Sequence, residues 1–526
     1  MFRDNADRSQ IAAAERETTP SWAKPHPQIA TLPAQRGSKR KNALPQHWKD
    51  WRVSPSEKEL LVIREAQETL AQGQVCVDER STYGDLVGSV ELTEHPLHRW
   101  FSYKEAYSPR LPIEVLGMLG SGDSRVVADP FAGVATTALS LQYHPLVSRT
   151  IGVEYSPFAQ FVGRTKLNWS LLSPKRLEQH VKRLRKFPVV ETLEAPSLAA
   201  FSNEEIFKER ALNALLSAKH SIFQDEELSG PERDFFLLGL AAIIEDSSGA
   251  MKDGRALRIL RGRTRPPKSL SPRRGALNGD GVRELLVNQW LAMLEDLRIL
   301  APMRARARSR RDLNLRGDAR NLEGVQHRGH RQHPLPDGSV GLFVYSPPYL
   351  NCIDYTEVYK LELWFLNFVE NNTEFRDVRL GTLRSHPSVR FKPSSLFAGV
   401  SHSVTDLIVT MAEFLDERLP RPGLGEMLLN YFEDMYSVLA EQYRVLEPGG
   451  SVACVVANST FSRRSGNSKT RREQWRLPVL TDVLIARLAE LVGFESIEIW
   501  EARNLRPRNV RSGTARESIV VARKPA

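Results

Sequence analysis

The sequence predicts an α/β protein built on one mostly parallel sheet with helices on its faces. Short apolar runs of strand length alternate with amphipathic stretches of helical length, a pattern typical of parallel sheets. Three of these runs end on a carboxylate, at Asp129, Glu154 and Asp318, and a fourth ends on a Pro-Pro turn at 346–349. Open α/β sheets bind ligands at the carboxyl ends of their strands. The sequence therefore predicts a ligand site at that edge.

The composition narrows the class of protein. The chain has 526 residues, enough for two or three domains, and a formal charge of +10, which favours a polyanionic partner. Cys76, Cys352 and Cys454 lack the spacing of a zinc site or a disulfide framework, so we expect no metal and a reducing compartment. The longest apolar run, 235–244, is too short to span a bilayer, and the N-terminus does not resemble a signal peptide. We expect a cytoplasmic protein of a bacterium or archaeon.

The N-terminal third begins without a hydrophobic period. Residues 1–45 are rich in Pro, Arg, Gln, Ala and Ser, which predicts a disordered arm. Residues 46–94 are predicted to be an N-terminal helical region, with a helical pattern over 56–72. An amphipathic helix over 111–119 follows, and Ser108-Pro109 is a typical helix start.

Two strand ends then form a candidate cofactor site. A strand over 125–128 leads into the segment 129–137, which reads DPFAGVATT and combines a Gly-bearing turn with a helix start. Backbone N–H groups in such a turn can approach a carboxylate or phosphate. The next strand, 150–153, ends on Glu154, where an acidic residue can accept hydrogen bonds from ribose hydroxyls.

Residues 176–311 are predicted to be a basic, mostly helical insertion. Helices are predicted over 174–186, 203–224, 231–245 and 281–304, and the first three of these stretches have helical apolar spacing. Two basic runs lie between and after these helices, and each can be either a solvated face or a set of phosphate contacts. We favour phosphate contacts, which would supply affinity and register rather than sequence choice. The candidate residues are Arg261, Arg263, Arg265, Lys268, Arg273, Arg274, Arg306 and Arg308.

The sheet pattern resumes after the insertion. A strand beginning near Asp312 ends on Asp318, the third carboxylate at a strand end. A ligand contact and a helix-capping role are equal alternatives for this residue. A strand over 339–344 stops at Ser346-Pro347-Pro348-Tyr349, because proline lacks a ladder donor. The turn offers a hydroxyl, prolyl carbonyls and an aromatic face. Such a set can hold a planar base with an exocyclic amine, although a plain strand-ending turn is the alternative.

The rest of the chain predicts the second half of the sheet. Residues 371–425 are a polar, loop-like interruption that could contact a target or be a surface excursion; it contains Arg384, His386, Arg390 and Lys392. The predicted elements around it are helices over 356–368, 426–446 and 480–491 and strands over 451–457, 496–500 and 517–522.

These motifs resemble those of S-adenosylmethionine-dependent DNA amino-methyltransferases, the N4-cytosine and N6-adenine family. Ser346–Tyr349 is similar to the family's S/D/N-P-P-Y/F/W tetrapeptide. The segment 129–137 resembles its D-P-F-x-G-x-G-T-T motif, with Ala135 in place of the second glycine, and 105–109 resembles its segment around a K-F-S-P helix start. The motif order resembles the α-type arrangement. The resemblance covers roughly 95–175 and 312–526.

The resemblance implies a Rossmann-like class I methyltransferase sheet of seven strands with a reversed terminal strand. It implies that 95–175 binds S-adenosylmethionine, that 176–311 contacts DNA, and that 312–526, with its loop at 371–425, carries out the chemistry. The cofactor residues would be Ser108, Asp129, Phe131, Gly133, Ala135, Thr136, Glu154 and Asp318. The catalytic residues would be Ser346, Pro347, Pro348 and Tyr349. The serine hydroxyl and the Pro347 carbonyl would accept the two amine N–H bonds, and Tyr349 would stack on a flipped base.

The expected activity is site-specific methylation of double-stranded DNA. Serine at the first motif position favours N4 of cytosine over N6 of adenine, and a cognate restriction or defence nuclease would be a natural partner. Two alternatives remain open: an RNA amino-methyltransferase, and a non-catalytic nucleic-acid-binding protein of the same fold. A C5-cytosine mechanism through a Cys352 thiolate is disfavoured, because the Pro-Cys context of those enzymes is missing.

Overall fold

A computed structural model describes most of the chain. The described residues are 40–42, 44, 58–103, 105–120, 126–252, 256–259, 278–309, 312–327, 331–465, 472–505 and 515–526. Most of the predicted arm at 1–45 lies outside them. So do six of the eight predicted phosphate contacts, Arg261, Arg263, Arg265, Lys268, Arg273 and Arg274.

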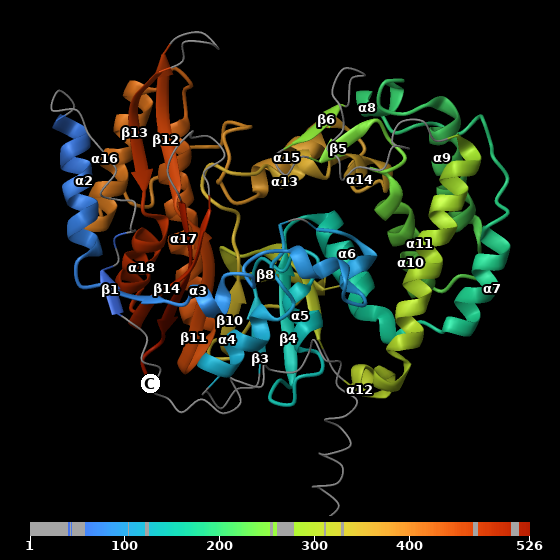
Figure 1. Cartoon of the computed structure of the whole chain (residues 1–526), viewed down its shortest axis with the longest axis horizontal. Coiled ribbons are helices and arrows are strands. Elements are labelled where there is room, and N and C mark those ends of the chain that lie inside the picture. The colour runs from blue at the N-terminus through green and yellow to red at the C-terminus, as the bar shows by residue number, and fades with distance from the viewer. Residues whose placement is uncertain are drawn as a thin grey trace, which may run out of the picture.

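The described residues form a large sheet of eleven strands in the middle of the molecule (Figure 1). In spatial order these are β1 (Arg40–Asn42), β2 (Val75–Asp78), β14 (Glu495–Leu505), β15 (Ala515–Arg523), β11 (Leu446–Ala457), β10 (Val340–Tyr345), β3 (Val126–Asp129), β4 (Arg149–Glu154), β7 (Leu313–Asp318), β8 (Asn321–His327) and β9 (Arg331–Gln332).

The strand directions in this sheet agree with the sequence prediction, but the sheet has more strands than expected. The five strands β11, β10, β3, β4 and β7 are parallel to their neighbours in turn, and β14 is parallel to β2. Strand β15 runs antiparallel to both β11 and β14. The mostly parallel α/β sheet is thus confirmed. Seven strands were expected, and β1, β2, β8 and β9 extend the sheet beyond that number at its two edges.

Helices cover both faces of the sheet because side chains alternate along each strand. Phe343 of β10 joins a core with α2 (Lys58–Ala71), α16 (Ser403–Arg418), α17 (Leu424–Val445) and α18 (Thr481–Val492). Leu342 and Val344, on the opposite face, join a core with α3 (Arg80–Tyr83) and α4 (Leu111–Leu119). All six residues of β10 are buried, as expected for a central parallel strand.

The region 176–311 packs beside the sheet as a helical layer, on the right in Figure 1. Four long helices lie where the sequence predicts them. The elements are α7 (Pro174–Leu184), α8 (Ala199–Ser202), α9 (Glu209–Gln224), α10 (Gly230–Ile243), β5 (Ala250–Lys252), β6 (Leu257–Ile259), α11 (Gly279–Ile299) and α12 (Arg304–Ser309). Their core also includes Phe158 of α6 (Pro157–Leu167) and Leu363 of α14 (Lys360–Phe365), so the layer is continuous with the sheet domain.

A buried carboxylate fixes this layer to the segment before the first central strand. Asp296 of α11 is fully buried and accepts hydrogen bonds from the Leu97 N–H and the Trp100 Nε1–H, both at 3.0 Å. Arg99 Nε donates to the same side chain at 2.9 Å. A boundary drawn between 175 and 176 therefore crosses shared contacts.

Three stretches differ from the sequence prediction. The helix expected over 356–368 is divided into α13 (Tyr355–Val358) and α14. The loop expected over 371–425 contains α15 (Asn372–Gly381) and α16, whose buried Val404, Leu407, Ile408 and Met411 have helical spacing. The antiparallel pair β12 (Ser459–Ser465) and β13 (Arg472–Val479) was not predicted. None of the described helices is long and apolar enough to cross a membrane.

Candidate active site

A cavity opens at the carboxyl edge of the parallel strands. Gly133, which follows β3, and Glu154, the last residue of β4, line it together with Asp318 of β7 and Ser346 after β10. Residues from both predicted half-sites thus share one cavity, although Gly133 and Ser346 are more than two hundred positions apart in the chain. The parallel register of β10, β3, β4 and β7 causes this, because it brings their carboxyl ends to one edge.

Asp129 holds the turn after β3 in shape. Its Oδ2 accepts hydrogen bonds from the Tyr107 hydroxyl at 3.0 Å and the Thr137 hydroxyl at 2.5 Å, and its Oδ1 accepts from the Phe131 N–H at 3.0 Å. Burial raises the pKa of Asp129 to about 6, while these hydrogen bonds oppose the shift. Asp129, Phe131 and Thr136 all line the cavity, as the resemblance implies.

Glu154 is bound to the same turn. Its Oε2 accepts the Gly133 N–H at 2.7 Å and its Oε1 accepts the Ser156 N–H at 2.7 Å. A carboxylate has about four lone-pair positions, and the Tyr155 N–H also contributes to binding this one, so limited acceptor capacity remains for hydroxyl donors from a ligand. Burial raises the pKa of Glu154, and the two N–H donors lower it in part.

Ala135 has its Cβ turned away from the cavity. The residue is left-handed, with φ 67° and ψ 35°, at the start of α5 (Thr136–Leu141). Its side chain is buried and packs over Gly163 of α6, where an added Cβ would lie 3.1 Å from the Ala135 Cβ. Ala135 is not among the residues that line the cavity. The left-handed backbone explains why a glycine would suit this position.

Ser108 is the second predicted cofactor residue that does not line the cavity. Its hydroxyl bonds to Glu91 and accepts the Arg110 N–H at 3.2 Å, which makes it a helix-start residue of α4. Its neighbour Tyr107 and the nearby Glu105 line the cavity instead.

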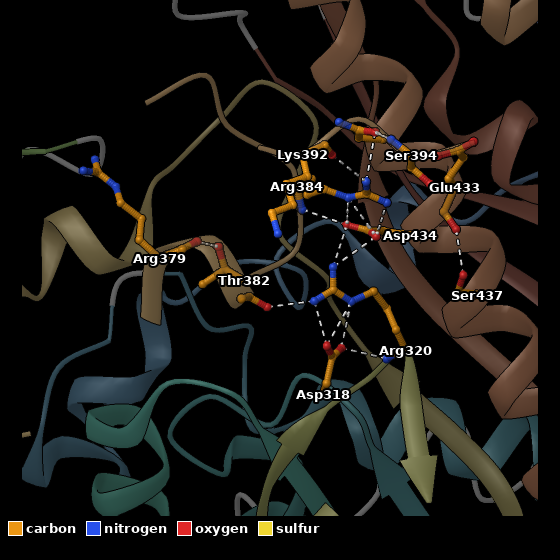
Figure 2. A network of polar contacts seen from close by, with 12 residues as sticks. Asp318, Arg320, Arg379, Thr382, Arg384, Lys392, Ser394, Glu433, Asp434 and Ser437 are labelled. Carbon is orange, nitrogen blue, oxygen red and sulfur yellow. Dashed lines mark hydrogen bonds and ion pairs between the residues drawn. The ribbon is translucent and has the colours of Figure 1, made fainter. Parts of the chain in front are cut away.

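Asp318 lines the cavity but is held by an arginine (Figure 2). Arg320 donates to Asp318 through its backbone N–H at 2.9 Å, its Nε at 2.9 Å and its Nη2 at 2.7 Å. The same guanidinium donates to Asp434 of α17 at 3.1 Å. The carboxylate is therefore charge-compensated and retains little free acceptor capacity.

Ser346 and Tyr349 form a short hydrogen-bonded chain at the Pro-Pro turn. The Ser346 hydroxyl donates to the Val455 carbonyl at 3.3 Å or to the Tyr349 hydroxyl at 3.4 Å. The Tyr349 hydroxyl donates to Glu517 at 2.7 Å, and Arg503 pairs with Glu517. Ser346 and Pro348 line the cavity, whereas Pro347 and Tyr349 do not.

Three tyrosines that the sequence analysis did not select form an aromatic wall of the cavity. The Tyr103 ring stacks on Tyr359 at 4.9 Å between centroids and on Tyr355 at 6.4 Å, with interplanar angles of 7° and 9°. The Tyr359 hydroxyl donates to Glu105 at 2.8 Å, and Lys252 lies 4.5 Å from the centroid of the Tyr359 ring. Tyr103 precedes the resembling segment 105–109, and proximity to that segment was the one available signal.

The two described candidates for phosphate contacts lie elsewhere. Arg306 and Arg308 belong to α12, which ends at Ser309, shortly before β7 begins. They therefore lie near the amino ends of the parallel strands, opposite the cavity edge, where Arg308 Nε donates to the Ser170 carbonyl at 2.8 Å. The structure does not bring them together with the cavity. Within the described part of the chain, no cluster of three or more His, Cys, Asp or Glu side chains could hold a metal ion.

Comparison with known proteins agrees with this geometry. The Type II methyltransferase M.BsoBI of Geobacillus stearothermophilus is 24% identical over 456 residues, covering 81% of this chain and 84% of that protein. The Type II methyltransferases M.AvaI of a Nostoc species and of Anabaena variabilis are each 22% identical over 434 residues, covering 76% of this chain and 79% of those proteins. No family model matches the chain. The resemblance to S-adenosylmethionine-dependent DNA methyltransferases is thereby confirmed, and over most of its length this chain is similar to these Type II methyltransferases.

Proposed function

We propose that this protein is a site-specific DNA methyltransferase that transfers a methyl group from S-adenosylmethionine to the exocyclic amine of a flipped base, with N4 of cytosine favoured over N6 of adenine. The observation that carries the proposal is the single cavity lined by Gly133, Glu154 and Ser346. Donor and acceptor must meet in one place for direct transfer, and these residues belong to the two predicted half-sites.

The residues of the cavity fit the cofactor. Gly133 has φ 50°, and a Cβ built there would project toward Tyr103 Cε1 at 3.7 Å, so the missing side chain leaves room against an aromatic ring. Glu154 retains acceptor positions for the ribose hydroxyls, and Phe131 and Thr136 would enclose the remainder. S-adenosylmethionine supplies an electrophilic methyl group when bound. Asp318 would receive the adenine amine only in competition with Arg320.

Ser346 is arranged to accept a hydrogen bond from an amine. Its single O–H is directed to the Val455 carbonyl or to the Tyr349 hydroxyl, which leaves the oxygen lone pairs available. We propose that this oxygen accepts one N–H bond and that the Pro347 carbonyl, which belongs to the same turn but does not line the cavity in this structure, accepts the other when the base is bound. The two bonds would direct the nitrogen lone pair toward the methyl donor. Positioning of this kind needs no covalent enzyme intermediate. Stacking of Tyr349 on the base stays a prediction, and the aromatic wall at Tyr103 offers a second stacking surface.

Duplex DNA as the substrate is consistent with the formal charge of +10 and with the similarity to Type II methyltransferases. We propose that 95–175 holds the cofactor, that 312–526 carries the chemistry, and that the basic layer 176–311 contacts phosphates. A role beside a cognate restriction nuclease follows the Type II designation of those relatives.

Long-read sequencing of DNA from cells that express the protein tests the proposal directly. We expect one modified base, N4-methylcytosine, in one sequence context, and tritium transfer from labelled cofactor to DNA but not to RNA. Ser346→Ala should abolish transfer. Ser459→Ala is the matched control. The Ser459 hydroxyl donates to the carbonyl of Leu350, the residue after this turn, at 3.2 Å, but Ser459 does not line the cavity. Full activity of Ser346→Ala, or label in RNA alone, would refute the proposal.

A further inference from the structure

One segment of the cavity wall carries polar groups that the proposed chemistry does not use. Residues 381–386, here called the strap, begin at the last residue of α15 and contribute Gly381, Thr382, Leu383, Ser385 and His386 to the lining. The strap lies in the region 371–425, which the sequence predicts to be loop-like.

The strap is fastened at both ends of the cavity. At the cofactor end, Arg320 Nη2 donates to the Gly381 carbonyl at 2.8 Å, and a Cβ on Gly381 would lie 1.7 Å from the Tyr155 hydroxyl. At the end beside the Pro-Pro turn, the Asn351 N–H donates to the Ser385 carbonyl at 2.7 Å. The strap therefore spans the cavity from the strand end of Asp318 to the exit of the Ser346 turn.

The middle of the strap is fixed by charge (Figure 2). The Arg384 N–H donates to Asp434 Oδ2 at 2.9 Å, and its Nη2 donates to Asp434 Oδ1 at 2.7 Å. Arg384 also donates to Asn430 at 2.9 Å. Because the Arg384 side chain is directed to α17, the neighbouring side chains of the strap are held in fixed positions on the cavity wall.

Two of those neighbours are buried without a hydrogen-bond partner in the described structure. The Ser385 hydroxyl and both ring nitrogens of His386 have none, and the two residues are 1% and 3% exposed. The nearest carboxylate to His386 is Asp354, with Oδ2 at 3.6 Å from Nδ1. Buried polar groups in native proteins are nearly always paired, so an orphaned pair on a cavity wall indicates a ligand that completes it.

The chemistry of these two groups selects a class of ligand. A hydroxyl donates one hydrogen bond, and a neutral imidazole always carries one N–H. Burial lowers the pKa of His386, and the nearby Asp354 carboxylate opposes that shift. Cytosine presents two adjacent acceptors, N3 and O2, beside its amine. Adenine presents one acceptor, N1, followed by an apolar C–H.

We propose that Ser385 and His386 bind the polar edge of the flipped base by donating to two adjacent acceptors, so that the strap selects cytosine over adenine. This inference rests on the proposed function and adds the residues that determine base specificity. The amine is left to Ser346 and the Pro347 carbonyl, and the ring lies against the aromatic wall.

The test uses the full chain and duplex oligonucleotides that carry the sequence context found by long-read sequencing, with either cytosine or adenine at the target position. We expect Ser385→Ala and His386→Ala each to lower kcat/KM for cytosine DNA about 10- to 100-fold, the effect of leaving one acceptor unpaired. The ratio of cytosine to adenine methylation should fall as well. Calorimetric affinity for S-adenosylmethionine should stay within about twofold of the wild type, since no cofactor contact is assigned to these residues.

His402→Ala is the matched control, because His402 caps α16 in the same region without lining the cavity. His386→Asn, which keeps a donor in a smaller side chain, should retain more activity than His386→Ala and shows that a loss is not unfolding. Unchanged base preference in both alanine variants overturns the inference. A loss of cofactor affinity as large as the loss of kcat/KM overturns it too. If the wild type binds the cofactor but methylates no DNA, the proposed function is wrong. If the wild type methylates DNA and only the base preference of the variants is unchanged, the role of the strap alone is wrong.

Discussion

Asp434 provides the sharpest test of how the cavity wall is held. This carboxylate is 2% exposed and accepts hydrogen bonds from two guanidinium groups, those of Arg320 and Arg384, together with the Arg384 N–H (Figure 2). Asp434→Asn keeps the shape of the side chain and one oxygen acceptor but removes the charge between the two arginines.

The magnitude follows from burial and from the partners that remain. Removing one member of a buried ion pair costs about 3–5 kcal/mol. Arg320 keeps Asp318, and Arg384 keeps Asn430. The two arginine side chains are also 21% and 15% exposed, so water screens part of the loss. We expect a destabilisation of about 2–3 kcal/mol, concentrated in the strap and the segment after it.

The assay is hydrogen exchange followed by mass spectrometry, combined with urea denaturation. Peptides from 381–397 should exchange faster in Asp434→Asn, whereas peptides from β3 and β10 should not change. Glu433→Gln is the control, because Glu433 is the adjacent buried carboxylate on α17 and accepts only the Phe397 N–H, at 2.8 Å, in the described structure. Equal exchange and equal urea midpoints in the two variants would show that the arginine pair does not fasten the strap.

Three further predictions concern the turn, the helical layer and the Pro-Pro motif. Ala135→Gly relieves about 1–2 kcal/mol of left-handed backbone strain. It also loses about 0.8 kcal/mol of methyl burial and raises the entropy of the unfolded chain. The free energy of unfolding, measured with urea, should therefore change by less than about 1 kcal/mol. Calorimetric affinity for S-adenosylmethionine should not change, since the Cβ faces away from the cavity; a tenfold loss would contradict that placement. Lys166 is buried, and desolvation lowers its pKa to about 7 from 10.5. Between these pH values the folded state binds fewer protons than the unfolded state, so the free energy of unfolding should rise by a few kcal/mol from pH 7 to 10.5. The rise should be smaller in Lys166→Met. Urea midpoints measured at both pH values can show the difference. Tyr349→Phe removes the hydroxyl that Ser346 donates to and should lower kcat about tenfold without changing cofactor affinity; equal rates in single-turnover assays would exclude that role.

The sequence predicted those parts of the site that are encoded locally. A strand followed by a carboxylate or a Pro-Pro turn is a continuous pattern, and parallel pairing then brings the strand ends to one edge. For this reason the sequence alone points to Gly133, Glu154 and Ser346, which the structure brings to one cavity. The helix over 111–119 was predicted with its observed bounds because its apolar period and its Ser-Pro start agree.

The aromatic wall and the strap could not be predicted in the same way. Tyr103 and Tyr355 are about 250 positions apart, and neither belongs to a periodic or motif pattern, so only the tertiary structure brings their rings together. The strap occurs in polar, Pro-containing sequence that is equally typical of a surface loop. What distinguishes it is the burial of Asp434 on α17, which is a property of packing rather than of local sequence.

The Arg320 side chain connects the two half-sites of the cavity through its hydrogen bonds and ion pairs. Its guanidinium donates to Asp318 on the cofactor side, to the Gly381 carbonyl of the strap, and to Asp434, which also holds Arg384. Any ligand group that takes an oxygen of Asp318 must weaken an Arg320 contact, and that guanidinium then relies more on Asp434 and on the strap carbonyl. Cofactor at the Asp318 end and base at the Ser385 end would therefore be coupled through one side chain, whereas two independent pockets would bind their ligands without mutual effect.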